Sequence, residues 1–155
     1  MKRKHIWSDL LFQLGMIFYV GGILSHIVIG AVLGNEPEAL YYMAVYKEKS
    51  AYILILPGLA MKVIATVVHS FDYLTKPAWL KLNYLCMAFL TVNAVVFLVP
   101  MMPEVTQLAL ENLKLGAISQ AYKDTVTTEM WIGISNVIPL ITMVVLSTIG
   151  PKFHK

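Results

Sequence analysis

Charged residues are scarce in this chain of 155 residues, because Asp, Glu, Lys and Arg together make up only 14% of it. Soluble proteins contain about 25% charged residues. Hydrophobic residues reach 58%, and they come in long runs that do not alternate with polar residues. This composition excludes a disordered chain, and a net charge of only +3 spread along it does not indicate a nucleic-acid binder. It predicts an integral membrane protein whose partner is the lipid bilayer.

Cysteine is also nearly absent, since Cys86 is the single one. A single cysteine excludes a scaffold held by intramolecular disulfides. The position of Cys86 inside an apolar run is typical of a small buried hydrophobic residue. The sequence has no Cys/His metal motif and no phosphate-binding loop. We therefore predict no metal site, and no catalytic residue can be named.

Four apolar stretches are long enough to cross a bilayer, which takes about 20 residues in a helix. They cover residues 10–33, 51–71, 79–101 and 130–149. The first follows Met-Lys-Arg-Lys, as in a signal peptide, but its apolar stretch is too long to be a cleaved one. Residues 1–155 are therefore predicted to form one all-α membrane domain, a bundle of four transmembrane helices.

The distribution of basic residues predicts the orientation, because loops on the cytoplasmic side are enriched in Lys and Arg. With four spans, both termini lie on one side. The basic residues on that side are Lys2, Arg3, Lys4, Lys76, Lys81, Lys152 and Lys155. Those on the other side are Lys47, Lys49, Lys114 and Lys123. The excess predicts a multi-pass protein of the inner (cytoplasmic) membrane with both termini in the cytoplasm.

Residues 103–129 form a long external loop between the third and fourth spans. Within it, five apolar residues are spaced to form one helical face: Val105, Leu108, Leu113, Leu115 and Ile118. We expect an external amphipathic helix here, which lies on the membrane surface or covers the end of the bundle. A gating role and a simple covering role both fit the pattern.

Polar side chains at membrane depth are expensive and therefore informative. At a rise of 1.5 Å per residue, His26, Lys62, Asn93 and Asn136 fall in the middle or outer half of the membrane, one on each span. Their similar depth predicts one polar site inside the bundle that binds a cofactor. Alternatively, each is satisfied separately by a neighbouring backbone or, for Lys62, by extending its side chain toward the surface.

Haem b and quinone are both candidate cofactors for such a site. The depth count is against a single haem bound between His26 and His69, because the two residues are roughly 20 Å apart in height. Two separate sites, or one His paired with another ligand, stay open as alternatives. Nine methionines invite a copper interpretation, but they form no clustered metal-binding pattern. Methionine is also an ordinary filler of apolar helices.

Several short motifs resemble a group of small four-helix membrane proteins that includes the HemJ-type protoporphyrinogen oxidases and the CopD copper-resistance membrane domain. They are Tyr-Val-Gly-Gly at 19–22, Ile-Leu-Pro-Gly at 55–58, Trp-Leu-Lys-Leu at 79–82, Ser-Asn-Val-Ile-Pro at 135–139 and Pro-Lys-Phe at 151–153. The resemblance implies the four-helix architecture, with haem or porphyrin chemistry as its functional expectation. The family's histidine early in the first span has no counterpart, since Leu11, Phe12 and Gln13 stand there.

Three functions remain open at this stage. The first is a redox-linked membrane protein that binds haem, porphyrin or quinone inside the bundle. The second is a non-enzymatic accessory subunit of a larger membrane complex. The third is a small transporter of a metal or solute, in which Lys62 neutralises an anion and the chain acts as a homo-oligomer. Whether the chain is an enzyme is left open.

Overall fold

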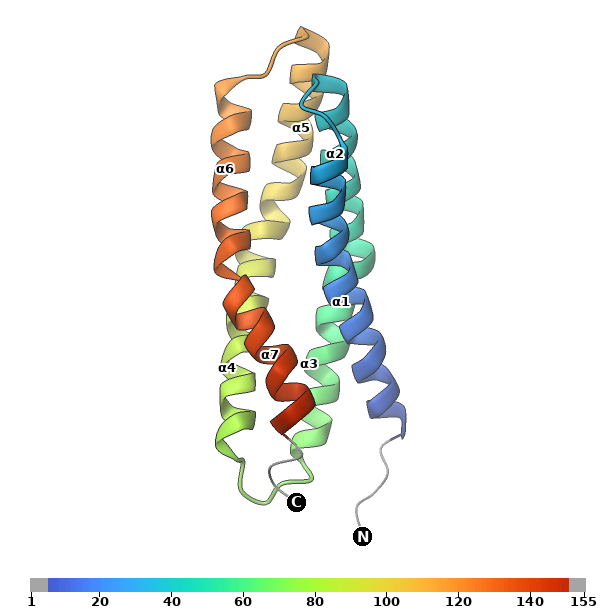
Figure 1. The fold of residues 1–155 in the computed structure, drawn as a ribbon, viewed down its shortest axis with the longest axis vertical. Coiled ribbons are helices and arrows are strands. Elements are labelled where there is room, and N and C mark those ends of the chain that lie inside the picture. The colour runs from blue at the N-terminus through green and yellow to red at the C-terminus, as the bar shows by residue number, and fades with distance from the viewer. Residues whose placement is uncertain (1–5, 151–155) are drawn as a thin grey trace.

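The protein is an all-α bundle of four long helical arms, as the sequence predicts (Figure 1). The computed structural model describes residues 6–150. Each of the four arms is long and apolar enough to cross a membrane. The first arm is α1 (Ile6–Val32), and the second consists of α2 (Pro37–Ser50), η1 (Ala51–Ile55) and α3 (Leu56–Ser70). The third consists of α4 (Ala78–Val92), η2 (Asn93–Leu98) and α5 (Val99–Leu115), and the fourth of α6 (Gln120–Ser135) and α7 (Val137–Ile149).

The bundle has two distinct ends. α1 begins, α7 ends, and the turn at residues 71–77 joins α3 to α4 at one of them, which we name the terminal end (Figure 1). The turns at residues 33–36 and 116–119 lie at the opposite, distal end. Five of the seven basic residues that place the termini in the cytoplasm lie outside the described part of the chain, as does the motif at 151–153. These basic residues are Lys2, Arg3, Lys4, Lys152 and Lys155.

The arms are longer than a bilayer requires. The third arm has 38 residues, which corresponds to about 57 Å of helix, whereas the apolar core of a bilayer is about 30 Å thick. The excess lies at the distal end, where α2, α5 and α6 carry ten of the thirteen charged residues in the described helices. The second, third and fourth arms therefore extend from the apolar part of the bundle into a charged distal extension.

The external amphipathic helix predicted between the third and fourth spans is wrong. Residues 103–115 are the last part of α5, continuous with the third span, and the chain turns at Gly116 (φ 66°) before α6 begins. The physical reason is that the apolar face has a protein partner. Val105 and Leu108 pack with Leu40 of α2, which itself begins well before the predicted start of the second span. The apolar face therefore packs against another arm and does not lie on lipid.

Two arms contain π-helical turns at corresponding places. η1 is followed two residues later by Pro57, and η2 by Pro100. Proline lacks the N–H for the next backbone bond, and its ring crowds the preceding turn, which widens in response. The fourth arm is interrupted as well, at Asn136, three residues before Pro139. These prolines mark the boundary between the apolar part of the bundle and the distal extension.

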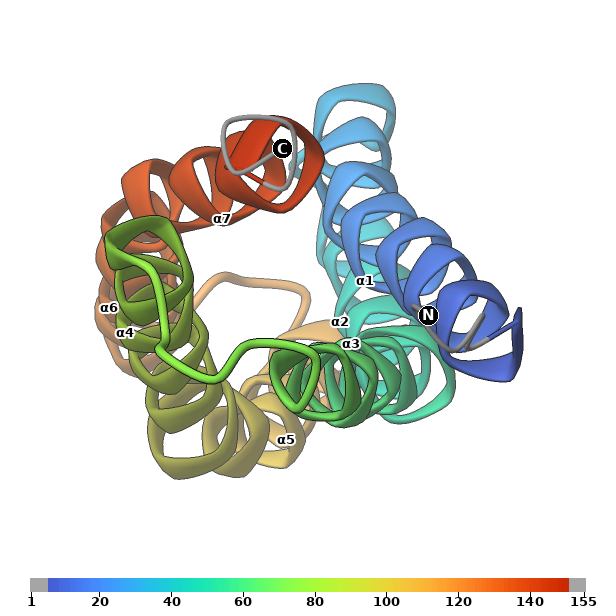
Figure 2. The same ribbon diagram turned by 90° about the horizontal axis from the view of Figure 1, so that it is seen from below.

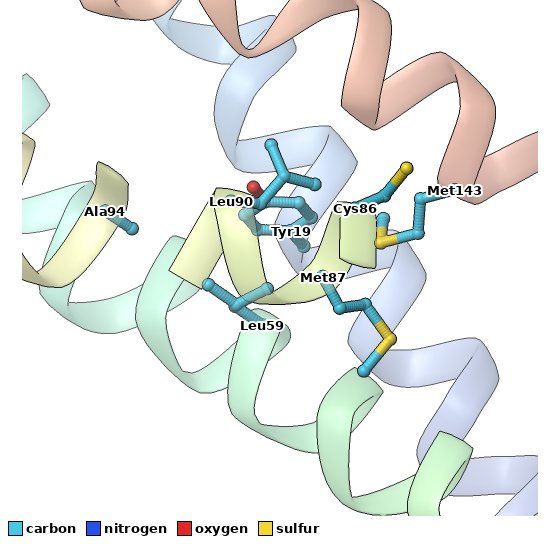
Figure 3. Packing of buried hydrophobic residues seen from close by; sticks show 7 residues of the cluster. All are labelled: Tyr19, Leu59, Cys86, Met87, Leu90, Ala94 and Met143. Carbon is cyan, nitrogen blue, oxygen red and sulfur yellow. The ribbon is translucent and has the colours of Figure 1, made fainter. Parts of the chain in front are cut away.

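The apolar part has its own core, contributed by α1, α3, α4 and α7 together with η2 (Figure 3). Its buried residues are Tyr19, Leu59, Cys86, Met87, Leu90, Ala94 and Met143. Seen along the bundle, α1 and α3 lie on one side and α4 and α7 on the other (Figure 2). Gly15 and Gly58 bring α1 and α3 into backbone contact, because a Cβ on Gly58 would lie 2.5 Å from the Tyr19 amide nitrogen.

Candidate functional site

Lys62 is completely buried in α3, between the apolar core and the terminal end. Its Nζ donates a hydrogen bond to Ser147 Oγ of α7 at 2.6 Å. The same Nζ lies 3.6 Å from the centroid of the Phe12 ring on α1, a cation–π contact. Among residues 6–150, the ion pairs within 4.0 Å do not include Lys62. The ammonium is thus surrounded by uncharged groups.

The backbone contact between α1 and α3 fixes where this lysine starts. A Cβ on Gly15 would lie 2.7 Å from the Lys62 amide nitrogen, so no side chain separates the two helices at that level. One turn later, Thr66 Oγ1 donates to the Lys62 carbonyl at 2.9 Å. The lysine stem therefore begins inside a tight helix crossing and extends to its partners on α1 and α7.

A polar network continues from Lys62 across the bundle. Ser147 accepts from the ammonium and donates its own proton to Asn83 Oδ1 at 3.4 Å. Asn83, on α4, is only 1% exposed, and its Nδ2 has the sulfur of Met87 as its partner at 3.9 Å. Three helices that are distant in sequence thus contribute to one buried polar group, which we name the Lys62 network: Lys62, Ser147 and Asn83.

A cavity of about 340 Å³ lies next to the Lys62 network. Ser147, Asn83 and Phe12, which contact Lys62 or its partner, form part of the wall. Asp9 and His69, on the first turn of α1 and the last turn of α3, line it as well. The cavity therefore lies between the network and the terminal end of the bundle.

Asp9 and His69 form a pair in the wall of this cavity. His69 Nε2 lies 2.9 Å from Asp9 Oδ1, which is an ion-pair distance. The same nitrogen lacks a partner with hydrogen-bond alignment. Asp9 is 62% exposed and His69 31% exposed, so water reaches both side chains. The pair thus connects the cavity wall to the solvent or lipid headgroups at the terminal end.

His26 lies away from the Lys62 network and has its own partners. Its Nε2 is 2.5 Å from Ser50 Oγ, at the end of α2. Because the Ser50 hydroxyl donates to the Lys47 carbonyl at 3.1 Å, His26 Nε2 is assigned as the donor in this contact. Tyr46 packs its ring edge-on to the imidazole, with centroids 6.3 Å apart. These contacts connect α1 to the distal extension.

Asn93 and Asn136 are brought together by the fold. Asn93 Nδ2 donates to Asn136 Oδ1 at 2.6 Å and lies 3.4 Å from Ser135 Oγ. Asn93 is the first residue of η2, and Asn136 is the joint between α6 and α7. The bond therefore joins two places where helices are interrupted, and it stabilises their relative position.

The four predicted site residues are thus distributed over three places. Asn93 and Asn136 bond to each other, while Lys62 and His26 each bond to different residues. The structure adds neighbours that the sequence analysis did not select for the site: Phe12, Asn83 and Ser147. Asn83 had a detectable signal, since it is a polar residue in an apolar span, but Ser147 and Phe12 had none.

Metal binding gains no support from the arrangement of side chains. Within residues 6–150, no three His, Cys, Asp or Glu side chains gather in a group that could hold an ion.

Comparison of the chain with protein-family models, curated proteins and solved structures finds no match. Function must therefore be argued from the Lys62 network and its cavity.

Proposed function

We propose that this chain is a multi-pass protein of the inner membrane that binds a small molecule in the cavity beside Lys62. The observation that carries the proposal is a fully buried ammonium with uncharged neighbours, placed next to a cavity. A lone charge in an apolar interior is costly, and such residues in membrane helices commonly belong to functional sites. The cavity volume falls within the usual range of small-molecule sites, about 300–1,000 Å³.

The terminal end faces the cytoplasm in this proposal. Lys76 and Lys81 are exposed there, whereas Lys47 and Lys49 share the distal end with most of the acidic residues. An impermeant maleimide should label Leu115→Cys in intact cells, but label Leu74→Cys only after the cytoplasmic face is opened. Both side chains are well exposed, and the native Cys86 is buried. The reverse labelling pattern would overturn this orientation.

Redox chemistry remains the functional class we favour, and the geometry favours quinone over haem or porphyrin as its ligand. An axial haem ligand needs a free imidazole nitrogen facing the iron. His26 does not line the cavity, and the Nε2 of His69 is the nitrogen paired with Asp9, which leaves only His69 Nδ1 to face an iron there. The resemblance to HemJ-type and CopD proteins supports the four-helix architecture of this proposal more than it supports their ligand.

Transport by a single copy has less support. On its helices, each core residue Tyr19, Leu59, Leu90 and Met143 lies farther from the terminal end than Phe12, Lys62, Asn83 and Ser147 respectively. Solute that entered from the terminal end would meet this core before it reached the distal extension. An accessory role within a larger complex, or in a homo-oligomer, is compatible with ligand binding and is decided by the species that co-purify.

Native mass spectrometry of the protein released from gentle detergent tests the proposal. We expect a bound small molecule on the wild-type chain and its loss from Lys62→Met, which keeps the length of the side chain and removes the charge. Lys81→Met is the matched control, because Lys81 is exposed at the terminal end and should keep the bound molecule. Equal retention by both variants would refute a site at Lys62, and an absorption band typical of haem would refute the preference for quinone.

A further inference from the structure

An unpartnered donor in the cavity wall narrows the class of ligand, provided that the proposed function holds. Among the buried side-chain atoms of residues 6–150 that lack a hydrogen-bond partner, Trp79 Nε1 and His69 Nε2 belong to residues that line this cavity. Because His69 Nε2 lies 2.9 Å from Asp9 Oδ1, Trp79 Nε1 is the donor of these two that still needs an acceptor. A buried N–H without an acceptor is costly, so native structures rarely contain one without a reason. An acceptor oxygen on a ligand would satisfy the Trp79 N–H.

The Trp79 ring cannot easily turn to find another acceptor. A Cβ on Gly150 would lie 2.5 Å from the indole, so the ring is stacked directly on the backbone at the end of α7. Tyr73 meets the same ring edge-on, at 5.8 Å between centroids. These two contacts fix the indole, and with it the direction of its N–H.

The charge of the wall disfavours an anionic ligand. Asp9 lines the cavity and its side chain is 62% exposed, and its carboxylate repels an anion that approaches from the terminal end. A neutral molecule with carbonyl oxygens avoids this repulsion, and its oxygens can still accept from Trp79 Nε1 and from Asn83 and Ser147, the members of the Lys62 network that line the cavity. The cavity wall therefore favours a ligand that is neutral and has acceptor oxygens, because it contains hydrogen-bond donors with the Asp9 carboxylate beside them.

The walls also favour a flat ring. Phe12, Tyr73 and Trp79 contribute aromatic faces or edges to a cavity of about 340 Å³. Aromatic groups pack well against each other in stacked or edge-to-face geometry. Quinones are neutral, flat, carbonyl-bearing rings that dissolve in a membrane. We infer that the ligand of the cavity is a quinone, with Trp79 Nε1 and the Lys62 network as the donors to its oxygens.

Two probes that differ in one substituent test this inference. 2-Methylanthraquinone is neutral, whereas anthraquinone-2-sulfonate carries a negative charge on the same ring system. Equilibrium dialysis against the full-length protein in lipid nanodiscs should show saturable binding of the neutral probe and much weaker binding of the sulfonate. Asp9→Asn should bring the affinities of the two probes closer together, because it removes one carboxylate from the wall.

The Trp79→Phe variant distinguishes the contribution of the N–H donor from that of the aromatic ring, because it keeps a ring and removes the N–H. We expect a five- to tenfold loss of affinity for the neutral probe, the size of about one hydrogen bond. Trp131→Phe, at an exposed position on α6, should leave the affinity unchanged. Thermal unfolding of each variant without probe shows whether it still folds.

The outcomes separate this inference from the proposed function. If the molecule that depends on Lys62 remains bound in native mass spectra but the neutral probe shows no saturable binding, the quinone class is refuted and the ligand site stands. Equal affinity for the sulfonate, or an unchanged affinity in a folded Trp79→Phe variant, would also refute it. Absence of both the bound molecule and probe binding would refute the site itself.

Discussion

The distal extension and the apolar part of the bundle differ in how their charged groups are paired. In the distal extension charged side chains form ion pairs, although Asn112 Nδ2 and Glu129 Oε2 are buried there without a hydrogen-bond partner among residues 6–150. Lys47 pairs with Glu129 at 3.0 Å, and Ser119 caps α6 by accepting from the Tyr122 amide. In the apolar part, the Lys62 ammonium has only uncharged partners within residues 6–150, and the Trp79 N–H has no acceptor in the same range.

This difference in polar contacts indicates that one region contributes mainly to stability and the other mainly to ligand binding. The distal extension has a compact apolar core of Leu40, Ala44, Val105, Ala109 and Tyr122, and the Ser119 side chain caps the start of α6. The unsatisfied polar groups near the terminal end lower stability, and they surround a cavity. We therefore interpret the distal extension as the region that holds the arms together. The apolar part of the bundle, near its terminal end, is the region that binds the small molecule.

The largest expected loss of stability comes from a substitution at the crossing of α1 and α3, in the apolar part of the bundle. Gly58→Leu should cost more than about 3 kcal/mol, because a Cβ there meets backbone atoms of α1 that cannot move aside locally. A large drop in the thermal unfolding midpoint in detergent is the expected result. Gly21→Ala is the matched control, since nothing lies within 4 Å of its Cβ, and it should unfold like the wild type.

Loss of a core side chain in the distal extension should come next in size. Leu40→Ala removes buried methyl groups between α2 and α5, which should cost about 2–3 kcal/mol. Hydrogen exchange should become faster in α2, α5 and α6, while the Lys62-dependent molecule seen by native mass spectrometry stays bound. Loss of that molecule without a change in exchange would contradict the division of roles.

The smallest expected effect concerns the bond between α2 and α6. Lys47 and Glu129 are largely shielded, with 19% and 11% of their side chains exposed, so their coupling should exceed that of a fully exposed pair. A double-mutant cycle of Lys47→Met and Glu129→Gln should give about 1 kcal/mol at low salt. A coupling energy of zero would mean that the pair does not tie these helices together.

The sequence was sufficient for the architecture because long apolar runs report directly on burial in lipid. It was insufficient for the distal extension, since Val105 and Leu108 form an apolar face that fits either a membrane surface or a protein partner. Only the early start of α2, at Pro37, decides between them.

The depth of each polar residue in the membrane also could not predict which of these residues contact one another. His26, Lys62, Asn93 and Asn136 were placed by counting along each helix, and that count contains no information on which face of a helix meets which neighbour. Lys62 was identified as an unusual residue, but its contact with Ser147 depends on the tilt of α7 after the joint at Asn136. Long-range geometry of this kind is set by packing.

The stability of Lys62→Met is the measurement that tests the central claim most directly. If the buried ammonium is kept for binding, its replacement by an uncharged side chain of similar length should raise the free energy of unfolding by about 1–3 kcal/mol and abolish binding of the small molecule. Thermal unfolding of the ligand-free proteins and native mass spectrometry on the same preparations give both results. A variant that is less stable than the wild type and still binds the molecule would contradict the account.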